Sequence, residues 1–181
     1  MSLPKYKYLL TYRYGEIIYR LNVVFCQQYI DKRSRTHDQM TQAGRSGKQN
    51  IIEGVADGRT SKKIEIKLLG VANGSFEELL ADYEDFLREK ELSIWPKDDP
   101  RVTAFRKRAY YVSSLGNLSD LGELIEKPRL PADPESAANL LITLLHQVTY
   151  LLMRQIAAAE KKFVEEGGYT ENLFKKRLNR K

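Results

Sequence analysis

The stretch that decides the fold is Gln39-Met40-Thr41-Gln42-Ala43-Gly44-Arg45-Ser46-Gly47-Lys48-Gln49-Asn50-Ile51-Ile52-Glu53-Gly54. It has the spacing of a helix, but the face expected to be buried carries Ala43, Gly44, Gly47 and Gly54 in place of leucines. A glycine inside a helix costs up to about 1 kcal/mol relative to alanine, so several glycines need a compensating gain. The usual gain is the close approach of a neighbouring helix. The stretch therefore predicts a tightly packed helical bundle.

Two polar side chains, Asn50 and Glu53, stand one turn apart beside this small face. We interpret both as structural residues and not as catalysts. A buried carboxylate needs hydrogen-bond partners, and we expect a neighbouring helix end or a basic side chain to supply them to Glu53.

Long apolar periodic segments extend the helical pattern on both sides of this stretch. The expected helices cover residues 9–30, 36–56, 62–90, 101–126 and 135–166. Ile64 and Val71 are placed on the buried stripe of the third. With no alternating strand pattern, the sequence predicts an all-α fold, an up-and-down antiparallel helical bundle with long helices and a short C-terminal basic tail. Residues 1–168 form the bundle domain, and residues 169–181 form a basic suffix segment.

Turn and capping residues mark the ends of these helices. Ser61 is expected to cap the third helix, after a turn in which Gly58 tolerates a left-handed conformation. Gly167 and Gly168 are expected to end the last long helix. The segment 91–100 is expected to be a loop anchored by Trp95, and a proline-rich connector, residues 127–134, cannot continue a helix.

The composition is that of one highly charged helical domain. The chain has 181 residues, 42% hydrophobic and 30% charged, with a net charge of +6. One cysteine, Cys26, excludes an intramolecular disulfide and suits a reducing cytoplasm; its apolar helical setting indicates a buried, inert thiol. We expect a cytoplasmic protein without a membrane partner, because no run approaches the roughly 20 apolar residues that span a bilayer.

The sequence offers little for catalysis or metal binding. A di-metal helical bundle needs Glu-x-x-His motifs, but the only histidines, His37 and His146, follow Ser34 and Thr143 at that spacing. We therefore expect no metal and no cofactor, and interpret His146 as a core residue. A dyad of Ser46 and His37 would be about 13 Å apart along one helix, which excludes it within a helix but not across subunits. Enzymatic activity is the weaker alternative.

Basic residues are the more suggestive feature, because lysine and arginine bind phosphates. Residues 106–108 are basic and precede two tyrosines that could stack on bases. The candidate nucleic-acid contacts are Arg45, Lys48, Arg59, Lys62, Lys63, Lys175, Lys176 and Arg177. For each cluster, simple surface solvation remains the alternative. Residues 57–99 are acidic instead, with seven basic and eleven acidic residues, and face either basic segments of a neighbouring subunit or water.

Three blocks of sequence together carry a resemblance. They are Gln39…Ala43…Ser46…Asn50-Ile51-x-Glu53-Gly54, then Ser61-Lys62-Lys63-x-Glu65, then Leu69…Ala72-x-Gly74-Ser75-Phe76-x-Glu78-Leu79. They resemble the four-helix bundle family of the ribosomal-RNA intervening-sequence proteins. The chain is most similar to the longer branch with a C-terminal suffix, to which Gly167-Gly168-Tyr169-Thr170-Glu171 would belong.

The resemblance implies a homo-oligomeric ring, commonly a pentamer with a basic central channel. The chain is also similar to accessory proteins of diversity-generating retroelements, which implies RNA or DNA and a reverse transcriptase or another protein as partners. One departure is that Thr41 and Gln42 stand where the family has paired arginines. Two function classes remain open: a weak, non-specific nucleic-acid-binding oligomer, and a structural or protein-partner scaffold with no nucleic-acid role.

Overall fold

The prediction of an all-α fold is confirmed. The computed structural model describes residues 4–58, 60–114 and 129–179, and these contain helices and no strand. The elements in chain order are η1 (Lys5–Tyr8), α1 (Leu10–Tyr29), α2 (Arg35–Asp57), α3 (Lys62–Glu89), α4 (Pro100–Ser114), α6 (Pro134–Glu166) and α7 (Tyr169–Leu178). The predicted fourth helix, 101–126, extends beyond α4 into residues 115–128, which lie outside the described residues.

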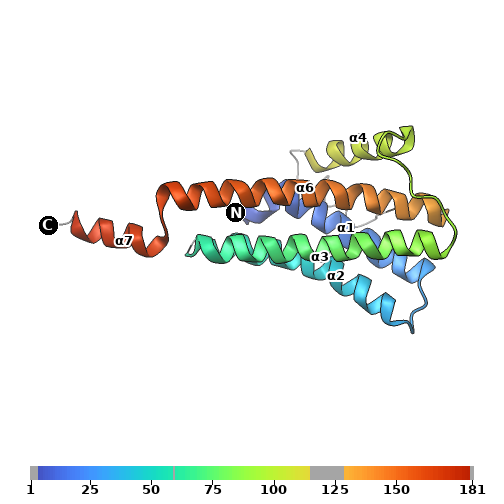
Figure 1. Ribbon diagram of the computed structural model, residues 1–181, viewed down its shortest axis with the longest axis horizontal. Helices are drawn as coiled ribbons and strands as arrows, with labels where there is room; N and C mark the ends of the chain where they lie inside the picture. The colour runs from blue at the N-terminus through green and yellow to red at the C-terminus, as the bar shows by residue number, and fades with distance from the viewer. Residues whose placement is uncertain (1–3, 59, 115–128, 180–181) are drawn as a thin grey trace.

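Four long helices, α1, α2, α3 and α6, form the body of the molecule (Figure 1). Each packs against two others, in the pairs α1–α2, α2–α3, α3–α6 and α1–α6. Thr11 near the start of α1 donates to Gln155 in the second half of α6 at 2.7 Å, so these two helices run in opposite directions. The shorter α4 packs on α6 and α1, at one side of this body.

Polar caps begin three of the long helices. Ser61 Oγ accepts a hydrogen bond from the backbone N–H of Ile64 at 3.3 Å, which confirms its expected capping role. Helix α2 begins one or two residues earlier than expected, because Ser34 caps it by accepting from the N–H of His37 at 3.1 Å. Asp133 caps α6 in the same way, with Pro134 in the first turn.

The two glycine turns behave differently. Gly167 has a φ of 73°, in the left-handed region, and its N–H bonds to the carbonyl of Phe163, so it ends α6 as expected. Gly58 does not use the left-handed conformation that it tolerates: its φ is −58° and its ψ is −13°, an ordinary right-handed helical conformation. Helix α2 therefore ends without the common left-handed glycine cap.

The core lies between the four long helices and is rich in aromatic side chains. Phe25 is fully buried and packs edge-on against Tyr83 and Phe86, with ring centroids 4.9 and 5.0 Å apart. The prediction that Ile64 and Val71 are buried is wrong: they are 45% and 44% exposed. The rest of the buried stripe of α3 includes Ala72, Leu79 and Tyr83, and Leu69, Phe76 and Leu80 are buried beside them.

The glycine face of α2 is the closest contact in the core. A Cβ built on Gly47 would lie 2.6 Å from two ring carbons of Phe76, and one on Gly44 would lie 3.0 Å from Asn22 Nδ2. This confirms the close helix approach expected from the sequence. The contacts lie within one chain, however, so this face is covered by α1 and α3 and gives no reason for a second subunit.

The loop between α3 and α4 is anchored by Trp95, as expected. Its side chain is 7% exposed, stacks on Phe105 of α4 with ring centroids 6.0 Å apart, and donates from Nε1 to Glu135 at 2.7 Å. The guanidinium of Arg101 lies 3.5 Å from the centre of its ring. Trp95 therefore ties α4 to the beginning of α6.

Candidate nucleic-acid interface and the α2–α3 groove

Two of the predicted phosphate-binding lysines are already paired within the chain. Lys48 Nζ lies 3.2 Å from Glu16 Oε2 and 4.2 Å from the centre of the Tyr19 ring, and its side chain is only 17% exposed. Lys62 Nζ contacts Glu65 one turn later on α3. A phosphate would have to break both ion pairs, so neither lysine is a free cation in this conformation.

The other predicted cations of the body do not form one cluster. Arg45 and Lys63 are exposed, but Arg45 lies twelve residues before the end of α2, about 18 Å from Asp57 at 1.5 Å per residue. Arg59 lies outside the described residues. The structure therefore does not bring Arg45, Lys48 and Lys62 together as one basic site.

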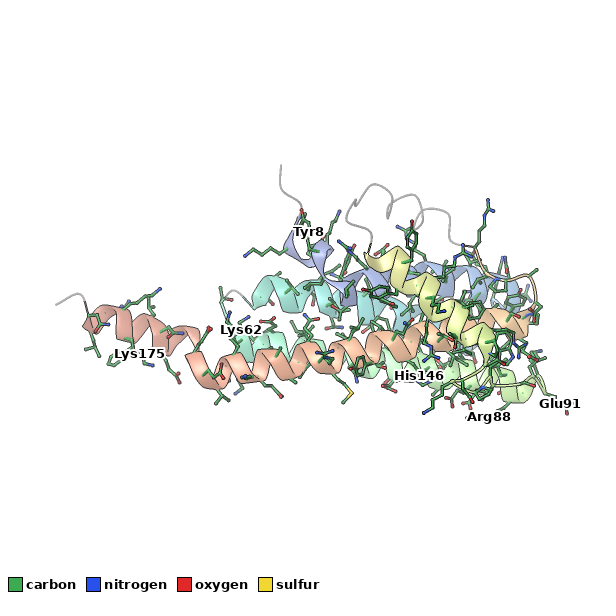
Figure 2. The ribbon with its side chains drawn as sticks, turned by 90° about the horizontal axis from the view of Figure 1, so that it is seen from above. Tyr8, Lys62, Arg88, Glu91, His146 and Lys175 are labelled. Carbon is green, nitrogen blue, oxygen red and sulfur yellow. The ribbon has the colours of Figure 1, made fainter. Side chains whose placement is uncertain are left out.

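Helix α7 carries the most accessible of the predicted basic residues. Lys175, Lys176 and Arg177 are all exposed in its last turn, and no ion pair joins them to any side chain in the described parts of the chain. Figure 1 shows α7 projecting beyond the body, and Figure 2 shows Lys175 outside the end marked by Lys62. Phe174, 62% exposed, lies beside these cations.

A buried carboxylate that sequence reasoning missed lies at the α1–α2 contact. Glu16 is 7% exposed and pairs with Arg20 at 3.0 Å and with Lys48 at 3.2 Å. Burial, together with the nearby charge of Glu16, raises the pKa of Tyr12 to about 12. The spacing of Glu16 four residues before Arg20 was a visible signal, whereas the pairing with Lys48 depends on tertiary structure.

The two polar residues of the glycine-rich stretch, Asn50 and Glu53, lie in different environments. Asn50 donates to the carbonyl and the hydroxyl of Ser46 at 2.9 and 3.2 Å, and the Ser46 hydroxyl lies 3.0 Å from that of Ser75 on α3. The expectation of a buried Glu53 is wrong: the residue is exposed, and it accepts a hydrogen bond from Gln49 on the same helix at 3.1 Å. Its position on the outer side of α2 leaves the carboxylate in water.

A buried network around Asn22 holds the other end of α2. Asn22 donates to the carbonyl of Met40 at 2.8 Å and accepts from the Tyr83 hydroxyl at 2.7 Å. Cys26 is fully buried beside it, and burial raises the pKa of its thiol to about 11. This confirms the buried thiol, and it places Cys26 among structural groups.

A groove of about 470 Å³ runs between α2 and α3. Its lining residues are polar or small: Gln39, Gln42, Ala43, Ser46, Ser75, Glu78 and Asp82. Partial burial raises the pKa of Asp82, and the neighbouring charges of Asp85 and Glu78 raise it further. No ion pair joins Glu78 or Asp82 to a cation among residues 4–58, 60–114 and 129–179, so the groove is an unneutralised acidic feature.

The histidines give no metal site. His146 is exposed, so its interpretation as a core residue is wrong. His37 is half-buried with no hydrogen bond to either ring nitrogen, and Ser46 bonds to Asn50 and Ser75 instead. Across the described ranges, no group of three or more His, Cys, Asp or Glu side chains is placed to hold a metal ion.

One helical stretch, Pro134–Leu178, passes a test for membrane spans by length and composition. Its apolar window is 61% buried inside the protein, because this part of α6 is the core helix that packs against α1 and α3. Core burial accounts for the apolar character of the window.

Comparison with known proteins adds no relative. No family model, no curated protein and no solved structure matches this chain. The resemblance to the intervening-sequence proteins, with the pentamer and the partners that it implies, therefore remains a prediction.

Proposed function

We propose that this protein is a non-enzymatic, homo-oligomeric helical bundle that binds nucleic acid weakly and without sequence specificity. The observation that carries the proposal is α7, where Lys175, Lys176 and Arg177 form a continuous, exposed and unpaired basic turn among the described residues. Phosphates need accessible cations, and an exposed aromatic such as Phe174 offers a surface on which a base can stack.

We place the centre of the proposed interface on α7 and not on the glycine-rich stretch, and two ion pairs support this. Lys48 and Lys62 are held by Glu16 and Glu65, so α7 carries most of the binding. Arg45 and Lys63 are exposed and supply secondary contacts. A single copy offers few phosphate contacts, and several copies on one strand would gain affinity through effective concentration. A pentamer, implied by the resemblance, would present five such helices.

The test is a titration of single-stranded RNA and DNA of mixed sequence at about 50 mM and about 200 mM salt. Binding should weaken steeply with salt and be similar for both strands. Replacing Lys175, Lys176 and Arg177 by Ala should weaken binding to all sequences alike, and should lower the salt slope by about two for single strands.

A matched control removes the same charge from the opposite end of the molecule. Lys32, Arg33 and Arg35 are exposed at the α1–α2 turn, and their replacement by Ala should reduce affinity much less. An equal loss in both variants would show that net charge, and not α7, attracts the strand. No retention by the intact protein at about 50 mM salt would refute nucleic-acid binding altogether.

A protein-partner scaffold is the second candidate, and exposed apolar side chains on α6 favour it. Tyr150 and Met153 are 60% and 63% exposed and lie one turn apart on the surface of that helix. Such residues are enriched in interfaces. If nucleic acid is not bound, this alternative is tested by replacing Met153 by Lys and measuring whether the variant loses binding to a purified protein partner.

A further inference from the structure

Helix α7 has an apolar face that no other described part of its own chain covers. Phe174 and Leu178 lie one turn apart and are 62% and 56% exposed, and Leu173 beside them is 38% exposed. Helices shorter than about 12–15 residues are marginal alone in water, and tertiary packing supplies most helical stability. A ten-residue helix with an uncovered apolar face is therefore expected to have a partner.

The charge of α7 restricts the chemistry of that partner. The helix contains Lys175, Lys176 and Arg177 against a single acidic residue, Glu171, whose carboxylate is used in accepting from the N–H of Gly168 at 3.1 Å. A complementary surface must offer carboxylates together with some apolar area.

The α2–α3 groove offers both properties. Glu78 and Asp82 are one turn apart on α3 and have no cation partner in the described residues, while Ala43, Ser46 and Ser75 leave room for a helix to approach. On the same side of α3, one and two turns before Glu78, lie Gly74, with no atom within 4 Å of a Cβ placed on it, and Val71, 44% exposed. Val71 in this strip was predicted to be buried, and its exposure gives the groove an apolar rim.

The α7 of the same chain cannot reach the Asp82 end of this groove. The end of α6 and the start of α3 lie at the same end of the molecule, as Figure 1 shows, and Asp82 is twenty residues along α3, about 30 Å away. The two-residue link after α6 and the ten residues of α7 span at most about 22 Å together. Contact of α7 with both Glu78 and Asp82 therefore requires a second molecule.

We propose that α7 of one copy docks in the α2–α3 groove of a second copy of this chain. The basic turn of α7 faces Glu78 and Asp82, and Phe174 covers Val71. The contact joins two different surfaces, so each copy can both give its α7 and receive another, and the assembly closes as a ring if the rotation between copies allows it.

Charge reversal tests this contact by sedimentation velocity over a range of micromolar concentrations, in the absence of nucleic acid. The wild-type chain should self-associate. Both the α7 variant K175E/K176E/R177E and the groove variant E78K/D82K should raise the dissociation constant by more than about tenfold, which is 1.4 kcal/mol. A single chain that carries both sets of substitutions restores opposite charges across the contact and should regain association.

A matched control reverses two exposed carboxylates with the same spacing outside the groove, E53K/D57K on α2. It adds the same charge as the groove variant and should associate like the wild type. Far-UV circular dichroism and thermal melting establish that each variant is folded. The proposal is overturned if the wild type is a monomer at high micromolar concentration, or if the groove variant keeps the mass of the wild type. It is also overturned if the chain that carries both sets of substitutions does not regain association.

The outcome is independent of nucleic-acid binding. If α7 docks on a second copy but no strand is retained, the proposed function fails and the contact stands. Docking and strand binding use the same cations of α7, so if both proposals hold, added RNA should compete with docking in the wild type.

Discussion

The glycine-rich part of α2 and the basic helix α7 differ in how far the rest of the chain covers them. In α2, Gly44, Gly47 and Gly54 have no side chains, so neighbouring helices approach closely and bury these positions. In α7, Phe174 and Leu178 are large, exposed apolar side chains that no other described part of the chain covers. The first region is completed by its own fold, whereas we propose that the second is completed by a second copy of the chain.

The largest effect is expected for Gly47→Leu. A Cβ at this position would lie 2.6 Å from the Phe76 ring, and a leucine adds three further carbons where no space exists. We expect a loss of about 3 kcal/mol or more in the free energy of unfolding, because overpacking moves both helices. Chemical denaturation measures it. As a control, Gly74→Ala places its methyl in open space and should gain about 0.5–1 kcal/mol. Equal effects at the two glycines would mean that the α2 face is not enclosed.

The second effect is the removal of the amide that holds α1 to α2. Asn22→Ala leaves the Met40 carbonyl and the Tyr83 hydroxyl without this partner in the core. Each unsatisfied buried group costs about 1–3 kcal/mol, so a loss of about 2–4 kcal/mol is expected. Asn50→Ala is the control, since Asn50 bonds only to Ser46 on its own helix and should cost less than about 1 kcal/mol. Similar losses in the two variants would contradict the network assigned to Asn22.

These two regions also show what the sequence can and cannot predict. The helix boundaries and the close face of α2 follow from caps, glycines and periodicity, which are local. The burial of Ile64 and Val71 was mispredicted because α3 is apolar on two sides, and periodicity alone does not say which side meets the core. Only the structure shows that the side of α3 with Ile64 and Val71 faces away from the core.

The candidate site was harder to predict for a different reason. Whether a lysine is free depends on its partner, and the partner of Lys48 is Glu16, thirty-two residues earlier on another helix. The partner of Lys62 is Glu65, three residues later, and this pairing was visible in the sequence. Counting charges in the sequence therefore overestimated the accessible basic surface near the glycine-rich stretch. The sequence also could not show that the cations of α7 are more accessible.

A smaller effect is expected for Asp82→Asn in the groove. Burial and the charges of Asp85 and Glu78 raise the pKa of Asp82 in the folded chain above its unfolded value of 3.8. The ionised carboxylate therefore costs stability above the folded pKa, and protonation removes that cost as the pH falls through the folded pKa toward 3.8. The variant should be more stable than the wild type at neutral pH, by less than the Asn22→Ala effect because the side chain is half-buried. The difference should disappear in acid.

Thermal melting of dilute, monomeric protein from neutral pH to below pH 3.8 gives this comparison. A stability difference that grows on acidification would contradict a raised pKa of Asp82 in the folded chain. At high protein concentration the sign should reverse, because the docking proposal places a cation from another copy beside the ionised Asp82, and Asp82→Asn removes that pairing.

The smallest free energy in the molecule should be that of opening α7. Isolated ten-residue helices are marginal in water, so the α7 amides of dilute protein should exchange hydrogen nearly as fast as an unfolded chain. The α2 amides around Gly47 should exchange only through global unfolding, since this part of the helix is enclosed by α1 and α3. Protection of α7 should then rise with protein concentration in the wild type and stay low in E78K/D82K, whose groove repels the helix. Strong protection of α7 at the lowest concentration, in both proteins, would mean that its own chain covers it, and the contrast between an enclosed α2 and an uncompleted α7 would fail.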